Sequence, residues 1–294
     1  MRLIIEALLI LAALEQDHRA AVEFPLDMAL NSVDDQYEGC RENMTNKVET
    51  DYLQDELNKS SVFKEAWQEG ENKSKSPEVN LTRNHSIAIY VYTNSAYDVY
   101  GKFNEDVRSS KQDYANKSFK WYSLHFLLTD AIKILKLKQK ACFNVTYRGT
   151  NVTFVKNVLN NEIRFGQFTS SSLNRNVTKD FGNTSCFEIY TCEGVYIANY
   201  SKYPEQEEVL IPPYETFKVT AVKNRTDQPD LWCDTVYMVK SSGKKSYLNC
   251  GFCDSRSRDA FCNGMNCALC NSGNCVAFLN ILLILTLFCK VFTC

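Results

Sequence analysis

The stretch Glu205-Gln-Glu-Glu-Val-Leu-Ile-Pro-Pro-Tyr-Glu215 runs acidic side chains straight into a short apolar segment. In an extended chain Gln206 and Glu208 would share one face, while Glu207 would take the other. A carboxylate at a strand entrance can stabilise a developing positive charge, as in the oxocarbenium-like sugar of a breaking glycosidic bond. Taken alone, the stretch is more typical of a solvated acidic turn.

A second stretch, Cys142-Phe-Asn-Val-Thr-Tyr-Arg148, has the composition of a strand. A period of two predicts a core-facing apolar side, Phe143, Val145 and Tyr147, and a polar side, Asn144, Thr146 and Arg148. An arginine at the strand's end, just before Gly149, can hold a phosphate or a carboxylate through its fork of donors. By itself it is also typical of a solvated surface arginine.

Between them lies Phe165-Gly-Gln-Phe-Thr-Ser-Ser-Ser172, where adjacent serines follow an aromatic pair. The stretch reads either as a turn or as a set of hydroxyls that bind a sugar or an amide. No suitable histidine stands nearby in the sequence, so a Ser-His nucleophile pair has little support.

Together, Tyr147-Arg148-Gly149, Phe168-Thr-Ser170-Ser-Ser172 and Gln206-Glu207-Glu208-Val-Leu-Ile-Pro-Pro, in this order, resemble the vertebrate ecto-ADP-ribosyltransferases. These are arginine-directed, often GPI-anchored mono-ADP-ribosyltransferases related to clostridial-type toxins. The stretch Asp34–Cys40 looks like that family's N-terminal signature, and the resemblance covers roughly residues 23–250. It implies an α+β ADP-ribosyltransferase fold, with NAD as substrate and no metal.

The resemblance also assigns roles to individual residues. Arg148 is expected to bind the NAD phosphates, and Ser170 begins the element that holds the nicotinamide ribose. Glu208 matches the catalytic glutamate, which would stabilise the oxocarbenium ion as nicotinamide leaves. The implied NAD-binding set is completed by Tyr147, Gly149, Ser171, Ser172, Phe181 (an aromatic expected to pack on nicotinamide) and Gln206.

Gln206 departs from the family's ExE pattern, whose first glutamate orients or deprotonates the acceptor guanidinium. An amide accepts a hydrogen bond but neither takes a proton nor pairs with a cation. We therefore expect NAD glycohydrolase activity at least equal to transfer to protein arginine. The alternative is a catalytically silent anchored glycoprotein that keeps the fold as a binding surface, and the retention of Arg148, Ser170 and Glu208 favours the enzyme.

The two ends predict export. Met1–Ala21 reads as a signal peptide, with Arg2 before an apolar run, although a buried first helix is the alternative. Residues 22–252 would be the catalytic domain and 253–275 a Cys-rich stalk. Residues 276–294 resemble a hydrophobic tail removed when a GPI anchor attaches near Asn266, rather than a retained or buried helix. This places the protein on the extracellular face of the plasma membrane.

Glycosylation sequons agree with that location. They occur at Asn43, Asn58, Asn72, Asn80, Asn84, Asn116, Asn144, Asn151, Asn176, Asn183, Asn199 and Asn224. Asn144 would share a strand face with Arg148, about 13 Å away, so a glycan there would crowd the site.

Thirteen cysteines in an exported chain predict disulfides. The resemblance implies the pairs Cys40–Cys250 and Cys142–Cys192, and leaves Cys186 and Cys233 as a guessed third pair. The spacings Cys250-x2-Cys253 and Cys267-x2-Cys270 also permit a zinc knuckle, but an oxidising compartment favours disulfides.

The remaining patterns concern fold class and exclusions. Asp51–Gly70 and Ser118–Lys138 have helical spacing, with His125 expected to be structural, while Ser86–Thr93 is predicted as a strand. Short β-like runs follow at Cys142–Arg148, Phe187–Cys192, Glu207–Ile211, Thr216–Val222 and Val236–Ser241, which indicates an α+β fold. A net charge of −2 argues against nucleic-acid binding, and dinucleotide and phosphate-loop fingerprints are absent.

Overall fold

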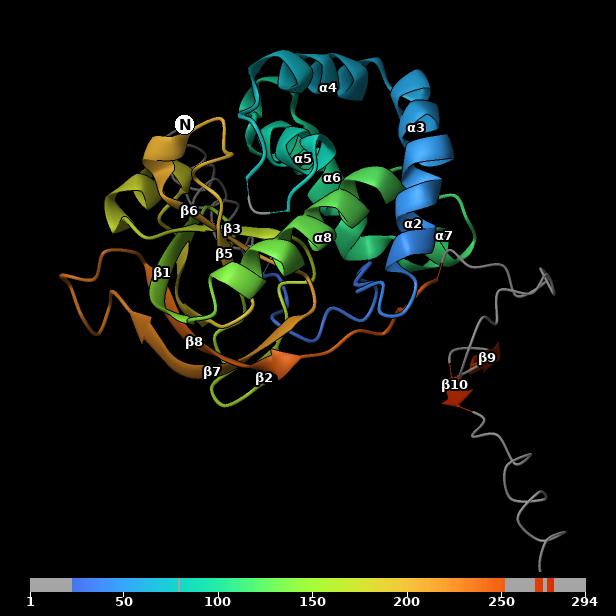
Figure 1. Cartoon of the computed structure of the whole chain (residues 1–294). Helices are drawn as coiled ribbons and strands as arrows, with labels where there is room; N and C mark the ends of the chain where they lie inside the picture. Colours follow the sequence, from blue (N-terminus) through green and yellow to red (C-terminus); the bar gives the residue numbers. More distant parts are fainter. Residues whose placement is uncertain (1–22, 79, 252–267, 272–273, 278–294) are drawn as a thin grey trace, which may run out of the picture.

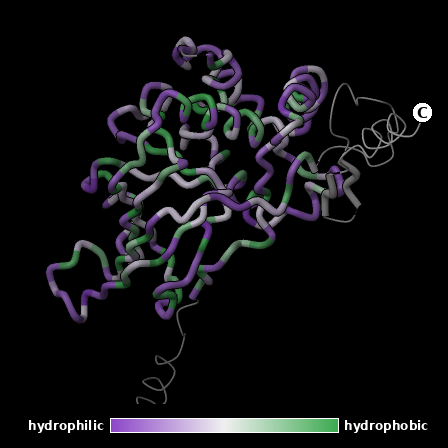
Figure 2. The backbone as a smooth tube through the Cα atoms, turned by 60° about the horizontal axis from the view of Figure 1, so that its bottom comes forward, coloured by the Kyte–Doolittle hydropathy of each residue, from purple (hydrophilic) through white to green (hydrophobic). Residues whose placement is uncertain are grey.

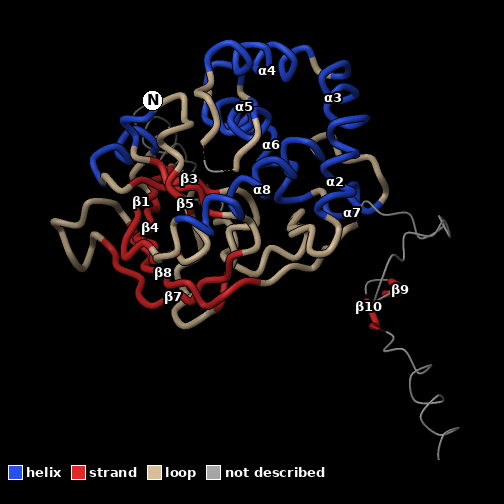
Figure 3. Tube along the Cα trace, viewed as in Figure 1, coloured by secondary structure: helices blue, strands red, loops and turns tan. Residues whose placement is uncertain are grey.

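A helical layer from the first half of the chain packs beside a mixed sheet from the second half (Figures 1 and 3). The computed structural model describes residues 23–78, 80–251, 268–271 and 274–277. The helices are α2 (Arg41–Lys47), η1 (Val48–Tyr52), α3 (Leu53–Lys59), α4 (Ser61–Lys73), α5 (Arg83–Thr93), η2 (Ser95–Tyr97), α6 (Val99–Ser109), α7 (Lys111–Ala115) and α8 (Tyr122–Lys138). The predicted α+β arrangement is confirmed.

The sheet has the order β2-β7-β8-β4-β1-β3-β6-β5. Its strands are β1 (Phe143–Thr150), β2 (Glu162–Ile163), β3 (Thr169–Ser172), β4 (Ser185–Thr191), β5 (Val195–Tyr196), β6 (Glu208–Ile211), β7 (Glu215–Asn224) and β8 (Thr235–Lys244). The turns η3 (Arg175–Phe181) and η4 (Pro204–Gln206) interrupt this half, and β9 (Ala268–Asn271) pairs separately with β10 (Asn274–Ala277). Because β1, β3 and β6 are neighbours, the three sequence motifs lie side by side.

Two apolar cores sandwich this sheet. One lies under the helices and includes Phe103, Leu124 and Phe168, and the other covers the opposite face with Phe187, Phe217 and other large side chains. Within single helices polar and apolar stretches alternate, as expected of elements that bury one side (Figure 2).

The strand prediction for Ser86–Thr93 is wrong, because Arg83–Thr93 forms helix α5. The Thr82 backbone N–H donates to His85 Nδ1 at 2.9 Å and caps its first turn. Residues 85–92 are all buried, since α4, α6 and α8 surround the helix. A short run that is apolar on all sides carries no amphipathic period, so its pattern does not distinguish a helix from a strand.

The alternation predicted for β1 is also wrong in part. Thr146 is fully buried, whereas Val145 is 38% exposed. The pairing of β1 with β4 shifts register between Phe143 and Thr146, which reverses the faces of the intervening residues.

Helix α8 confirms the prediction for Ser118–Lys138, although it begins only at Tyr122. His125 lies in the core, with Nδ1 2.8 Å from the Tyr37 hydroxyl and Nε2 3.0 Å from the Val33 carbonyl oxygen. Burial lowers the pKa of His125 to about 4, so the ring is neutral at physiological pH. The expectation of a structural histidine is confirmed.

Three disulfides close the domain: Cys40–Cys250, Cys142–Cys192 and Cys186–Cys233. Both pairs implied by the resemblance are confirmed, and so is the guessed third pair. Cys142–Cys192 joins the start of β1 to the end of β4, the strand beside it.

The Asp34–Cys40 stretch joins the beginning of the domain to its end. Asp34 forms a buried ion pair with Arg164 and accepts hydrogen bonds from the backbone N–H groups of residues 247 and 248. Asp35 accepts from those of Cys250 and Gly251, each at 2.9 Å. A carboxylate that accepts several fixed donors is a strong structural clip.

The predicted signal peptide, most of the stalk and the end of the tail lie outside the described residues. Within the part that the structure describes, no helix combines the length and apolarity needed to cross a bilayer.

Candidate active site

A cavity of about 530 Å³ opens where β1, β3 and β6 meet the segments around η2 and η3. Every site residue predicted from the sequence lines it: Tyr147, Arg148, Gly149, Ser170, Ser171, Ser172, Phe181, Gln206 and Glu208. Residues far apart in the chain are brought together because β3 pairs with β1 on one side and with β6 on the other.

Arg148 reaches across β3 from β1. Its Nη1 donates to the Ser170 carbonyl oxygen at 2.8 Å, and its Nη2 donates to the Tyr100 hydroxyl at 3.3 Å. Burial opposes the charge of Arg148, but the Tyr100 and Tyr92 phenols and the Glu208 carboxylate outweigh it, so the pKa of Arg148 is raised. The guanidinium is therefore a fixed positive charge on the cavity wall.

Glu208 begins β6 opposite Ser172 of β3 and is only 6% exposed. Burial raises the pKa of its carboxyl to about 7, while a hydrogen bond with the Ser170 side chain and the charge of Arg148 act in the opposite direction. A carboxyl with this pKa, in a cavity and beside a cation, is typical of a functional group.

The three serine hydroxyls of β3 have different hydrogen-bond partners. The Ser171 hydroxyl donates to the Val209 carbonyl oxygen at 3.0 Å, and the Ser172 hydroxyl donates to the Gln206 carbonyl oxygen at 2.6 Å. These two hold β3 against the segment that carries Glu208. The Ser170 hydroxyl instead lies 3.3 Å from the Tyr92 hydroxyl and bonds the Glu208 carboxyl.

Gln206 and Glu208 do not share the face of one extended strand, so that prediction is wrong. Gln206 ends the 3₁₀ turn η4, and Glu207 has the left-handed conformation, with φ of 47°. This turn still leaves both Gln206 and Glu208 on the cavity wall.

Gly149 allows η3 to lie directly on β1. A Cβ atom at Gly149 would lie 2.3 Å from the Gly182 carbonyl oxygen and 2.6 Å from that of Thr178. Any side chain at this position would push η3 away, and with it Phe181, which is 54% exposed at the cavity rim.

The sequence missed the tyrosines that complete the cavity. The Tyr92 hydroxyl donates to the Phe168 carbonyl oxygen at 3.1 Å and accepts from Asn104 Nδ2 at 3.2 Å, while Tyr100 contacts Arg148. Recognition of α5 as a helix would have placed Tyr92 near its C-terminal end, but no motif marks it.

The described residues include no cluster of histidine, cysteine or acidic side chains that could hold a metal ion. Of the cysteines in the zinc alternative, Cys250 is bonded to Cys40. Cys253 and Cys267 lie outside the described residues.

Comparison with known proteins matches the family model described as NAD:arginine ADP-ribosyltransferase to residues 26–236. The chain is 38% identical to mouse (Mus musculus) T-cell ecto-ADP-ribosyltransferase 2, over 78% of each chain. It is 33% identical to mouse GPI-linked NAD(P)(+)–arginine ADP-ribosyltransferase 1, over 78% of this chain and 74% of the relative. Among solved structures, a mutant of the eucaryotic mono-ADP-ribosyltransferase ART2.2 in complex with NADH has a TM-score of 0.65 and 34% identity, covering 77% of this chain and 98% of that one.

Proposed function

The chain belongs to the NAD:arginine ADP-ribosyltransferase family, and from this premise we propose that it both transfers ADP-ribose from NAD to protein arginine and strongly hydrolyses NAD. The observation that carries the proposal is the convergence of Arg148, Ser170 and Glu208 on one cavity. Full retention of this set favours an enzyme over a silent binding glycoprotein.

The reaction breaks the bond between the nicotinamide nitrogen and the ribose. Its electron pair leaves with neutral nicotinamide, and positive charge develops on the sugar. The Glu208 carboxylate hydrogen-bonds a ribose hydroxyl and stabilises that charge. The lone pair of an acceptor then forms the new bond, and the acceptor loses a proton.

Arg148 and the serines orient the dinucleotide. The guanidinium carries a fixed positive charge and donors suited to the NAD phosphates. Ser170 holds the Glu208 carboxyl from one side, so the catalytic oxygen has a defined direction. Phe181 at the rim supplies an aromatic face for nicotinamide.

Gln206 sets the balance between the two outcomes. A guanidinium is a poor nucleophile until it loses its proton, and an amide cannot take that proton. Water needs less activation against an oxocarbenium ion, so hydrolysis proceeds where transfer is slow. The Gln206→Glu variant restores a carboxylate at the cavity wall.

The test incubates purified ectodomain with labelled NAD and follows nicotinamide, free ADP-ribose and labelled acceptor together. Wild type should release nicotinamide together with mostly free ADP-ribose. Gln206→Glu should transfer more of the labelled ADP-ribose to an arginine analogue. Glu208→Ala should neither release nicotinamide nor label the analogue. If wild type modifies the analogue as fast as Gln206→Glu, the role of Gln206 is wrong. No nicotinamide release by either protein would support the silent glycoprotein.

We also propose that residues 22–252 form the catalytic domain, displayed outside the cell after removal of residues 1–21. In this proposal residues 253–275 form a stalk that carries a GPI anchor, and 276–294 are cut away. The composition of both ends and the GPI-linked mouse relative support it. A phosphatidylinositol-specific phospholipase should release the protein from intact cells, and retention of all protein on the treated cells would contradict the anchor.

A further inference from the structure

A glycosylation sequon, Asn151-Val-Thr153, begins the loop that follows β1. Arg148 lies near the end of the same strand. Both Asn151 and Val152 line the cavity, and the Asn151 residue is exposed. Asn144, where the sequence raised a conflict, is exposed on β1 but does not line the cavity. Among the sequon asparagines of the described residues, Asn151 is the one that itself lines the cavity.

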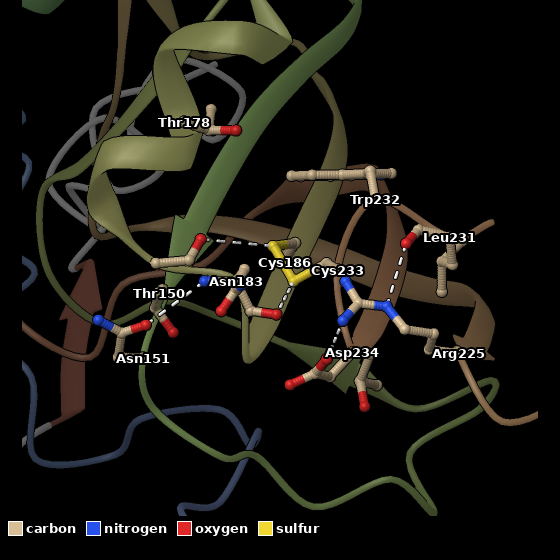
Figure 4. Close-up of a disulfide and its surroundings, with 12 residues drawn as sticks. Thr150, Asn151, Thr178, Asn183, Cys186, Arg225, Leu231, Trp232, Cys233 and Asp234 are labelled. Atoms are coloured by element: carbon tan, nitrogen blue, oxygen red, sulfur yellow. Dashed lines mark hydrogen bonds and ion pairs between the residues drawn. A yellow bond between two sulfur atoms is a disulfide. The ribbon is translucent and has the colours of Figure 1, made fainter. Parts of the chain in front are cut away.

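The Asn151 amide has a defined orientation. Its Oδ1 accepts from the Asn183 backbone N–H at 3.4 Å, and a Cβ atom on Gly182 would lie only 2.4 Å from that oxygen. Figure 4 shows the oxygen turned toward Asn183, with the nitrogen on the opposite side. A sugar bonds to Nδ2, so glycosylation leaves the contact with Asn183 intact and projects the glycan away from it.

We propose that Asn151 carries an N-linked glycan that screens the cavity rim and slows the approach of folded protein acceptors several-fold, while NAD, water and small guanidino compounds enter freely. This inference rests on the proposed function, whose balance between transfer and hydrolysis it deepens. It assigns part of that balance to the surface of the enzyme rather than to the chemistry of Gln206.

The rim around Asn151 explains why acceptor size matters. Val152 and Phe181 are apolar, line the cavity and are exposed at 36% and 54%. A protein acceptor must cover such a rim to present an arginine side chain to the cavity. A bulky, hydrated glycan rooted at the same rim opposes that contact, whereas a small molecule passes beside it.

The test uses the full chain expressed in mammalian cells. Thr153→Ala removes the sequon and keeps the Asn151 side chain. The matched control, Thr45→Ala, removes the sequon at Asn43 on α2, outside the cavity wall. Glycopeptide mass spectrometry measures occupancy of Asn151, and rates are compared for a folded protein acceptor, for agmatine and for nicotinamide release.

Wild type should carry a glycan at Asn151. Thr153→Ala should label the protein acceptor several-fold faster, with agmatine modification and nicotinamide release unchanged, and Thr45→Ala should match wild type. Trimming the glycans of native wild type with an endoglycosidase should reproduce the gain, which covers the case in which Thr153→Ala fails to fold.

An unmodified Asn151 overturns the proposal, as does equal labelling of the protein acceptor before and after glycan removal. An equal rise for agmatine and protein also overturns it, because the glycan would then be acting on NAD entry. Absence of nicotinamide release from every sample would instead refute the proposed function, while occupancy of Asn151 would still be read from the glycopeptide.

Discussion

Glu208 and Glu215 come from the same acidic-apolar stretch and are both buried, yet their surroundings differ. Glu215 is fully buried and accepts from the Thr191 hydroxyl at 2.6 Å and from the backbone N–H groups of Cys192 and Glu193 at 2.7 and 3.1 Å. Glu208 borders a cavity and has Ser170 and Arg148 as its neighbours. Burial is the largest cause of the raised pKa in both, so a raised pKa alone does not separate a catalytic carboxyl from a structural one.

The two carboxyl groups differ in how many hydrogen-bond donors of the protein their oxygens already contact. Three donors to Glu215 belong to the end of β4 and the turn after it, and the Ser241 side chain of β8 also bonds it, so this side chain joins that turn and β8 to β7. Among the described residues, the hydrogen bond identified for the Glu208 carboxyl comes from the Ser170 side chain, and the carboxyl borders the cavity. The comparison teaches that contact with a cavity, more than burial, distinguishes the proposed catalytic carboxyl from the structural one.

The largest predicted effect separates the two glutamates by function. Glu208→Gln should lower nicotinamide release on the order of 10³-fold, because a neutral amide does not stabilise the oxocarbenium ion. Glu215→Gln should keep most of the activity per folded molecule but lower the free energy of unfolding by roughly 1–3 kcal/mol, because one of the two acceptor oxygens becomes an NH2 group that cannot accept from these donors. Nicotinamide release and denaturant unfolding measure the two effects, and the reversed pattern would break the comparison.

The next effect concerns the cation beside Glu208. Arg148→Lys keeps the charge but loses the fork that reaches both the Ser170 carbonyl oxygen and the Tyr100 hydroxyl. We expect the KM for NAD to rise about tenfold with a smaller change in kcat. Steady-state kinetics test this, with Arg225→Lys at the Asp234 ion pair, which does not line the cavity, as the control. A change confined to kcat would contradict the binding role.

The pH profile sharpens the comparison further. In the proposed mechanism the active form of Glu208 is the carboxylate, so kcat/KM for NAD should fall as pH drops through about 7. Ser170→Ala removes a hydrogen bond that lowers the pKa of Glu208. The acidic limb of the kcat/KM profile should therefore move to higher pH by roughly one unit. A limb that stays in place would mean that another group titrates.

The same shift has a stability counterpart. Because the folded-state pKa of Glu208 lies above its usual 4.5, the folded state binds more protons between about pH 4.5 and 7, and stability falls as pH rises through that window. Glu208→Gln should remove this loss, so its melting temperature at pH 8 should equal or exceed that of wild type. A lower melting temperature at pH 8 would indicate that the Glu208 carboxylate is stabilising.

The smallest effect is expected at Tyr100. Tyr100→Phe removes the hydroxyl that accepts from Arg148 Nη2 at 3.3 Å while Nη1 keeps the Ser170 carbonyl oxygen. We expect the KM for NAD to rise about twofold to fivefold at unchanged melting temperature. An effect as large as that of Arg148→Lys would assign Tyr100 a direct part in the binding of NAD.

Sequence patterns predicted the sheet better than the helical layer. Runs such as Phe187–Cys192 and Val236–Ser241 correspond to β4 and β8. Short β-rich segments bounded by turns are typical of strands and seldom form other secondary structure. Helix α5 was missed because it is buried on all sides, and Tyr92 was missed with it.

The candidate site itself came from ordered motifs rather than from periodicity. Arg148, Ser170 and Glu208 were placed together by resemblance, and local patterning misplaced Val145 and Gln206. A register shift in β1 and a left-handed residue at Glu207 depend on strand partners distant in sequence, so no window of local sequence contains them.

The closure between the start and end of the domain has a mechanical consequence. Tension applied to the chain beyond residue 251 would meet the Cys40–Cys250 disulfide and the backbone bonds to Asp34 and Asp35 before it reached β8. These links share the load in parallel, and the covalent one passes it to the start of α2. A pull applied beyond residue 251 would thus leave the strands around the cavity unloaded.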